Sequence, residues 1–134
     1  MPLNLEIVTP DGITFADTVT SVVVPSTEGE LGLLPEHVGL VVQLEPGELR
    51  VDQNGQEIHL AVGGGFVEIA ANKVAVLTDM AIREDDIDES AAEEAMQRAE
   101  KAMRERKLEG EEHAAVAASL QRSLAQLKVK RRRG

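Results

Sequence analysis

The chain has 134 residues, a formal net charge of −10 at pH 7 and no cysteine. Disulfides and thiolate metal sites are therefore excluded, and the length suits one compact domain or a small domain with an appendage. No apolar run approaches the roughly 18 residues of a membrane span, and the N-terminus lacks the basic and apolar regions of a signal peptide, so we expect a soluble protein. With two Phe and no Trp or Tyr, the core must be built from aliphatic side chains.

The first part of the chain has the period-two pattern of β-strands. In LNLEIVT, which begins at Leu3, apolar residues alternate with polar ones, as in a strand with one buried face. Asn54-Gly55 stands between two such runs and tolerates the positive φ angles of a tight hairpin turn. GFVEIAANKVAVLTD predicts a second hairpin, turning at Asn72-Lys73. Several short strands at close spacing indicate a small antiparallel sandwich or flattened barrel.

Residues 25–37, PSTEGELGLLPEH, lie between predicted strands. Gly29 and Gly32 can bend the chain, and the leucines can anchor it to a core. Glu30 and His37 are left at a rim. From the residues alone, Glu30 is either a contact residue or a solvated charge, and His37 either faces a partner or satisfies a backbone group.

The last part of the chain predicts two helices. Asp88 can cap the first of them, and Gly110 separates it from the second. Each helix has an apolar stripe at helical spacing, formed by Ala92, Met96, Ala99 and Met103 in the first and by Val116, Leu120, Leu124 and Leu127 in the second. We therefore expect a sandwich domain over residues 1–84, followed by an antiparallel helical hairpin with a basic tail over residues 85–134.

The predicted hairpin should dock weakly. Its stripe is thin and rich in Ala, and at about 25 cal/mol per Å² two such helices gain only a few kcal/mol, close to what ordering the chain costs. An element held so marginally can exchange one partner for another.

Charge differs sharply along the chain. Residues 1–84 hold 13 acidic and three basic side chains, whereas residues 114–134 hold six basic and no acidic ones. A basic tail could make the chain a small binding module for nucleic acid. An acidic sandwich would repel the same polyanion, however, and no aromatic platform exists to stack bases, so we expect no nucleic-acid partner.

Four motifs, in order, resemble one known family. They are PS-x-x-GELGLLP-x-H from Pro25, GGGFVEI from Gly63, VAVLTD from Val74 and DDIDESAA from Asp85. Over nearly its whole length the chain is similar to the epsilon subunit of rotary F-type ATP synthases. The resemblance implies an α+β fold, with a β-sandwich of about ten strands and a C-terminal two-helix hairpin. It also implies a non-catalytic subunit of the central stalk that couples the gamma subunit to the c-ring and inhibits ATP hydrolysis through its hairpin.

The resemblance assigns roles to particular residues. Glu30 and His37 lie in the loop that would face the c-ring. An extended hairpin would meet the alpha and beta subunits, and its inhibitory contacts would be the cations Arg122, Lys128, Lys130, Arg131, Arg132 and Arg133. The alternative is that the tail is a solvated end. The subunit would be peripheral, at the cytoplasmic face of a bacterial inner membrane or the stromal face of a plastid thylakoid, and attached only through the complex.

Some relatives bind ATP in this subunit, and the chain matches their pattern only in part. Ile87, Asp88 and Arg122 match, but Ala91 and Gln126 stand where such relatives have arginine. Because two phosphate-binding cations are missing, we expect weak ATP binding at most and no cofactor.

Other chemistry lacks a signature in this sequence. The glycines at Gly63 are not followed by the Lys-Ser or Lys-Thr of a phosphate loop. The three histidines, His37, His59 and His113, lack metal-ligand spacing. A free-standing enzyme would need a nucleophile, a metal set or a cofactor motif, so no catalytic residue and no metal site is assigned.

Overall fold

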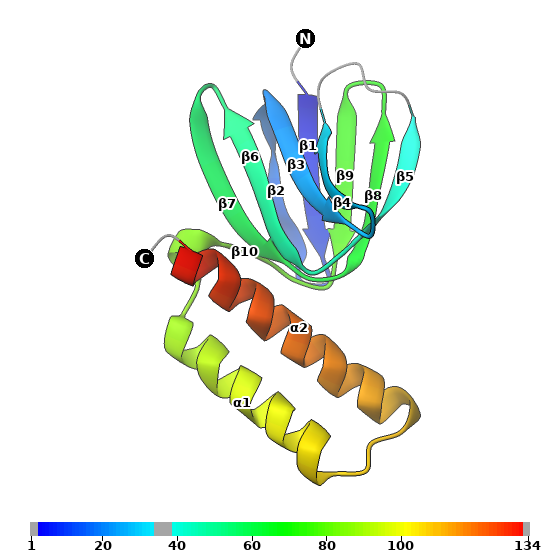
Figure 1. The fold of residues 1–134 in the computed structure, drawn as a ribbon. Coiled ribbons are helices and arrows are strands. Elements are labelled where there is room, and N and C mark those ends of the chain that lie inside the picture. The colour runs from blue at the N-terminus through cyan, green and yellow to red at the C-terminus, as the bar shows by residue number, and fades with distance from the viewer. Residues whose placement is uncertain (1–2, 34–38, 133–134) are drawn as a thin grey trace.

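The computed structural model describes residues 3–33 and 39–132. Within them it contains a ten-stranded sandwich, a short 3-10 turn and a pair of α-helices (Figure 1). The strands are β1 (Leu3–Thr9), β2 (Gly12–Val19), β3 (Ser21–Ser26), β4 (Gly29–Leu33), β5 (Leu40–Leu44), β6 (Gly47–Gln53), β7 (Gln56–Val62), β8 (Gly65–Ala70), β9 (Lys73–Thr78) and β10 (Ala81–Arg83). The helical part comprises η1 (Glu84–Asp86), α1 (Glu89–Glu105) and α2 (Gly110–Arg132). The α+β fold and the helical hairpin (α1 with α2) expected from the sequence are confirmed.

The strands form a sheet in the order β10-β7-β6-β3-β5-β8-β9-β1-β2, with β4 paired to β3. All pairs are antiparallel except β1 with β9, which run parallel. The sheet closes on itself because the far end of β2 reaches β6. There, Thr20 N donates to Asp52 O at 2.7 Å and Gln53 Nε2 donates to Thr18 O at 3.0 Å. The result is the flattened, two-layered sandwich seen in Figure 1.

The sandwich core is aliphatic, as the composition predicts. Leu3, Leu5 and Ile7 on β1 are at most 2% exposed, and the strand alternates buried and outward residues. Leu49 on β6 and Leu60 on β7 are fully buried opposite one another. Burying each such side chain stabilises the fold by about 1.5–3 kcal/mol.

One predicted hairpin turn is confirmed and the other is displaced by one residue. Asn54 and Gly55 have φ angles of 54° and 85° and connect β6 to β7. In the second hairpin Ala70 pairs with Lys73, so the turn is Ala71-Asn72 and not Asn72-Lys73. Register explains the shift, because the inward residues of β8 must lie opposite those of β9.

The segment that begins at Pro25 is largely a hairpin. β3 and β4 pair across a turn, and Gly29 has a φ of 104°, a conformation that favours glycine. Leu33 is fully buried and Leu31 packs partly against the core. Leu31 and Leu33 anchor the segment, as the sequence predicts, whereas the third leucine, Leu34, lies outside the described residues.

The helices begin and end near the predicted positions. Asp88 Oδ1 accepts from Ala91 N at 3.0 Å and caps α1. The predicted stripes are only partly correct. In α1, Ala92 and Ala99 are buried, but Met103 is 37% exposed; in α2, Leu124 is 40% exposed.

The burial pattern of α2 differs from the predicted apolar stripe for a geometric reason. This helix lies between the sandwich and α1 (Figure 1), so two of its faces are covered. Ser123, Ala125, Leu127 and Val129 are all buried. A single stripe, which assumes one covered face, cannot describe such a helix.

Candidate functional site

One face of α2 docks on the sandwich through a contact that we call the docking interface. Ala125 and Val129, one helical turn apart, pack in a small buried cluster with Ala61 of β7 and Ile87, which precedes α1. Met80 and Ile82 pack partly buried against the cluster. Because Ala61 is small, the helix can approach the sheet closely, yet the cluster buries little area.

A polar contact flanks this cluster. Arg122 NH1 donates to Asp79 Oδ2 at 3.2 Å, and both side chains are more than a third exposed. Asp79 itself lies against Gly63, where an added Cβ would be 1.7 Å from Asp79 Oδ1. Gln126 Nε2 lies 3.3 Å from Met80 Sδ on the same helix face. The docked position of α2 therefore depends on a glycine in the sandwich.

The basic end of α2 is bound by acidic and carbonyl groups near the start of α1. Arg131 Nε donates to Glu89 Oε2 at 2.9 Å, and its NH2 donates to Glu93. The hydrogen bonds to Glu89 and Glu93 raise the pKa of Arg131 above its ordinary value. Lys130 Nζ donates to Glu84 O at 3.3 Å. The last turn of α2 thus closes the hairpin by ion pairing.

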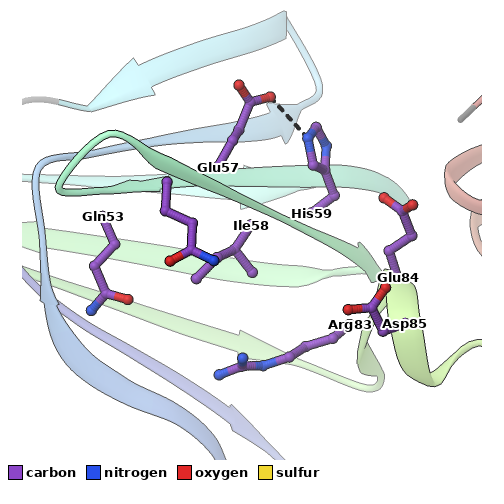
Figure 2. A pocket seen from close by; sticks show the side chains of 8 residues that line it. Gln53, Glu57, Ile58, His59, Arg83, Glu84 and Asp85 are labelled. Carbon is purple, nitrogen blue, oxygen red and sulfur yellow. Dashed lines mark ion pairs between the residues drawn. The ribbon is translucent and has the colours of Figure 1, made fainter.

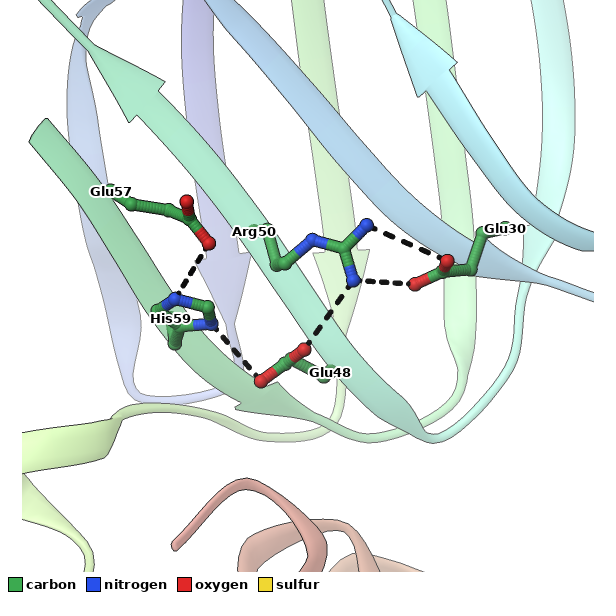
Figure 3. A network of polar contacts seen from close by, with 5 residues as sticks. All are labelled: Glu30, Glu48, Arg50, Glu57 and His59. Carbon is green, nitrogen blue, oxygen red and sulfur yellow. Dashed lines mark hydrogen bonds and ion pairs between the residues drawn. The ribbon is translucent and has the colours of Figure 1, made fainter. Parts of the chain in front are cut away.

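A chain of charged side chains crosses the outer face of β4, β6 and β7 (Figure 3). We call it the polar network, and its members are Glu30, Arg50, Glu48, His59 and Glu57. Arg50 NH1 lies 2.8 Å from Glu30 Oε2 and 3.6 Å from Glu48 Oε1. His59 Nδ1 lies 3.0 Å from Glu48 Oε2, and His59 Nε2 lies 2.8 Å from Glu57 Oε1.

Two of the three inner members of the network are buried. The side chains of Glu48 and His59 are 3% and 2% exposed, whereas those of Glu30 and Glu57 are 57% and 60% exposed. Buried charges in proteins are almost always paired. The network therefore joins two exposed carboxylates through the buried Glu48–His59 pair and the partly exposed Arg50.

His59 also borders a polar cleft of about 320 Å³ (Figure 2). The cleft is lined by Gln53, Gln56, Glu57, Ile58, His59, Arg83, Glu84 and Asp85. Arg83 also lies over the ring of Phe15, with its Cζ 5.3 Å from the ring centroid. The cleft connects the end of β10 to the side of β7 that carries the network.

The described residues contain neither a metal-binding cluster nor a membrane-spanning helix. Among residues 3–33 and 39–132, no group of three or more His, Cys, Asp or Glu is arranged to hold a metal ion. Neither helix in the same part of the chain is both long and apolar enough to cross a membrane.

Two family models together match residues 2–131. Residues 2–84 match the beta-sandwich domain of the ATP synthase delta/epsilon chain, and residues 85–131 match its long alpha-helix domain. The chain belongs to the ATP synthase delta/epsilon chain family. Similar relatives include the ATP synthase epsilon chain of Herpetosiphon aurantiacus, 43% identical over 129 residues that cover 96% of this chain and 94% of the relative. The epsilon chain of Alkalilimnicola ehrlichii is 41% identical over 128 residues, covering 95% and 91%. The resemblance carried by the four sequence motifs is thereby confirmed.

Chains in two solved ATP synthase assemblies share the fold. A chain in the Euglena gracilis mitochondrial ATP synthase, solved as an assembly of OSCP, F1 and c-ring, superposes with a TM-score of 0.73 at 23% identity, covering 90% of this chain and 76% of that one. A chain in the central stalk and c-ring of the Tetrahymena thermophila mitochondrial ATP synthase gives a TM-score of 0.59 at 14% identity, covering 100% and 98%. At such identities the likeness shows the fold alone.

The residues that the sequence resemblance assigns to ATP binding make other contacts in this structure. Ile87 is 6% exposed within the docking interface. Asp88 caps α1, and Arg122 is paired with Asp79. The docked hairpin brings Ile87 against α2, but it engages Asp88 and Arg122 in separate contacts.

The residues that the sequence resemblance assigns to contacts with other subunits lie on β4, on α2 or outside the described residues. Glu30 lies on β4 at the outer edge of the polar network, and His37 lies outside the described residues. Lys128 is exposed on α2. Arg132 is the last residue of α2, its side chain is not described, and Arg133 lies outside the described residues.

Sequence reasoning missed the polar network, although part of its signal was present. The Asn54-Gly55 turn fixes the register of β6 and β7 and sets Arg50 directly opposite His59. His59 stands between the core residues Ile58 and Leu60, so it must point to the outer face. That this outer face is buried could not be inferred, because the burial involves elements distant in sequence.

Proposed function

We propose that this chain is a non-catalytic subunit of the central stalk of an F-type ATP synthase. In this proposal the sandwich links the gamma subunit to the c-ring, and the helical hairpin restrains ATP hydrolysis. The chain is peripheral, on the side of the membrane that carries the catalytic head, and it is attached only through the complex. The names of its relatives support the assignment, and the surface of the sandwich supports the mode of binding.

The proposed contact with the stalk rests on one observation. A row of exposed apolar side chains crosses β2, β1, β9 and β8. Ile13 pairs with Val8, Val8 with Leu77, and Leu77 with Phe66. Laterally paired residues share one face of a sheet, and Ile13, Leu77 and Phe66 are 65%, 45% and 56% exposed. We call this set the apolar row. Contiguous exposed apolar surface of this kind is typical of an interface, and gamma is the partner that the family offers for it.

The restraint on hydrolysis rests on the cations of α2. Arg122, Lys130 and Arg131 each have a partner within the docked chain. If the hairpin leaves the sandwich, these groups become available to acidic surfaces of the catalytic head. Charge-assisted contacts of about 1.5–3 kcal/mol each would be enough to shift a marginal docking equilibrium.

Co-purification tests the stalk assignment. Tagged chain recovered from detergent-solubilised native membranes should bring alpha, beta, gamma and c subunits with it. Phe66→Asp with Leu77→Asp should abolish recovery of gamma while the isolated variant stays folded, because two charges would have to be buried at the contact. The matched control is Thr14→Asp, at an exposed position of β2 that neighbours the row. Recovery of gamma by the double variant would contradict the proposed surface.

Hydrolysis by the reconstituted complex tests the restraint. Deleting residues 128–134, or changing Lys128, Lys130 and the three arginines of the tail to Ala, should raise ATP hydrolysis and leave synthesis little changed. Lys101→Ala with Arg104→Ala removes two exposed cations of α1 and serves as the charge control. Unchanged hydrolysis in both tail variants would leave the subunit a coupling element only.

A further inference from the structure

We propose that the segment of gamma that binds the apolar row is an amphipathic helix with basic residues along one flank, and that these residues pair with Glu6 and Glu68. The inference rests on the stalk contact proposed above, because it concerns the same face of the sandwich. It adds the charge and the shape that the partner must have, which an apolar row by itself does not specify.

A second row of outward-facing side chains runs beside the apolar row. On β1, β9 and β8 it lies two residues from Val8, Leu77 and Phe66, and the sheet register gives its order. Laterally paired residues share one face of a sheet. Across β2, β1, β9, β8 and β5 the members are Ala16, Glu6, Ala75, Glu68 and Val41. We call this set the acidic row, because two carboxylates flank a central alanine.

Both rows lie on the outer face of the sandwich. The residues that separate them, Ile7 on β1, Val76 on β9 and Val67 on β8, all belong to the buried core, so their neighbours point outward. Val41, at the end of the acidic row, is 65% exposed. The helix α2 packs against β6 and β7 instead. This face is therefore open to a partner while the hairpin is docked (Figure 1).

The two carboxylates are available to a partner. In residues 3–33 and 39–132, Glu6 and Glu68 make no ion pair and no side-chain hydrogen bond. Lys73 lies on the same face, opposite Asn4 and Ala70, but within this part of the chain it makes no ion pair with either carboxylate. A partner without cations would remove water from both carboxylates and leave them unpaired, which is costly. A basic flank would replace that cost with charge-assisted contacts.

The spacing of the two rows fits an α-helix that lies across the strands. Neighbouring strands are about 4.8 Å apart, and a helix rises about 5.4 Å per turn, so successive turns fall over successive strands. The rows are about 7 Å apart along the strands, which is the length of two residues. A helix with its side chains is about 10–12 Å wide. Its apolar stripe can therefore cover the apolar row while basic side chains on its flank reach the acidic row.

The acidic row has room for those side chains. Ala75 carries only a methyl group, so the end of a long cation can lie between Glu6 and Glu68. Beyond Glu6, a hollow of about 300 Å³ lies over β1, β2 and β9 and is bordered by Glu6, Ala16 and Asp17. The aliphatic stem of a Lys or Arg can rest against such a surface while its charged head meets a carboxylate.

Association kinetics test the basic flank. The full chain is bound to F1 that contains alpha, beta and gamma but lacks this subunit. Glu6→Gln with Glu68→Gln should slow association about tenfold at low ionic strength and change dissociation less, as expected for charges at the rim of an interface. In about 1 M salt, where the Debye length is about 3 Å, the difference should disappear. Glu28→Gln with Glu105→Gln removes two exposed acids elsewhere and is the matched control.

Ala75 gives a second test that leaves both carboxylates intact. Ala75→Lys puts a cation between them, where it occupies the site of the partner's basic groups and repels them. Association should slow by at least about tenfold at low ionic strength. Ala75→Gln adds bulk without charge, so its effect should be much smaller. Thermal unfolding checks that both variants are folded.

Two kinetic results would overturn the basic flank. One is a Glu6→Gln, Glu68→Gln chain that associates as fast as the parent at low ionic strength, and the other is an equal effect of Ala75→Lys and Ala75→Gln. A further measurement uses the unmodified chain, in case the variants fail to fold. Hydrogen exchange of gamma should slow, on binding, in a helical segment that has an apolar stripe flanked by Lys or Arg. A protected segment without a basic residue would also refute the proposal.

The same kinetics separate this inference from the stalk assignment. Phe66→Asp with Leu77→Asp should prevent binding if the apolar row is the contact. Loss of binding in that variant, together with unchanged association of the Glu6→Gln, Glu68→Gln chain, refutes the basic flank and leaves the stalk contact intact. Full binding by the apolar-row variant refutes both.

Discussion

Arg122 and Asp79 are 43 residues apart in the chain, yet Arg122 NH1 donates to Asp79 Oδ2 at 3.2 Å. The bond links the middle of α2 to the residue that follows β9. It also occupies the arginine that the sequence resemblance assigns to phosphate binding. One contact therefore bears both on where the hairpin docks and on what else the helix can bind.

Gly63→Ala should weaken docking without unfolding the sandwich. The new methyl group would lie 1.7 Å from Asp79 Oδ1, so Asp79 must move and its bond to Arg122 should be lost. Amide hydrogen exchange should then quicken throughout α2 and stay slow in β6 and β7. Gly32→Ala is the control, since its added Cβ meets no atom of the described residues within 4 Å. Equal protection of α2 in both variants would argue against a role for Asp79 in docking.

A chain truncated after Arg83 should fold and still bind gamma. Among the described residues, the sandwich core includes none from the helices, and the docking interface is a separate small cluster. Removing the hairpin should therefore cost little, and thermal unfolding of the fragment should remain cooperative. An insoluble or molten fragment would show that the predicted boundary between residues 84 and 85 divides a single domain.

ATP should bind weakly to the isolated chain. Ala91 and Gln126 replace two cations of the family pattern, and Arg122 would first have to leave Asp79. Ala91→Arg with Gln126→Arg should strengthen binding at least about tenfold, as expected for added charge-assisted contacts to phosphate. Isothermal calorimetry measures both chains. Low-micromolar affinity in the unmodified chain would mean that Asp88 and Arg122 have partners not identified above.

Glu89→Gln with Glu93→Gln should loosen the closed end of the hairpin. Both carboxylates accept from Arg131, but the pairs are partly exposed, so the loss should be small and screened by salt. Helical thermal unfolding should shift down at low ionic strength, and the difference from the parent should vanish in about 1 M salt. Glu100→Gln, at an exposed position of α1, is the control. A difference that persists in salt would indicate that packing has changed instead.

Leu60→Ala and Leu124→Ala separate a core leucine from an exposed one. Leu60 is fully buried in the sandwich, and its truncation should lower the free energy of unfolding by about 2–5 kcal/mol. Leu124 is 40% exposed, so its truncation should stay within about 0.5 kcal/mol. Urea denaturation measures both. A large effect at Leu124 would support the single apolar stripe predicted from the sequence.

The sequence alone determined the features that depend on neighbouring residues. Alternation in β1, the Asn54-Gly55 turn and the Asp88 cap are all confirmed, because period, turn conformation and capping are decided within a few positions. The resemblance based on the family motifs also predicted that a β-sandwich precedes a helical hairpin in the chain. The turn at Ala71-Asn72 was missed by one residue, since strand register there depends on burial across two strands.

Only the tertiary structure decided which outward positions are buried. Leu124 follows a helical stripe yet lies exposed, while Ser123 beside it is buried, because α2 is covered from two directions. Glu48 and His59 occupy outward positions on β6 and β7, where alternation predicts solvent, and they are buried together there. Their burial comes from contacts between segments far apart in the chain. The periodicity within one segment predicts which side of the strand or helix a residue faces. It does not predict which other segment covers that side.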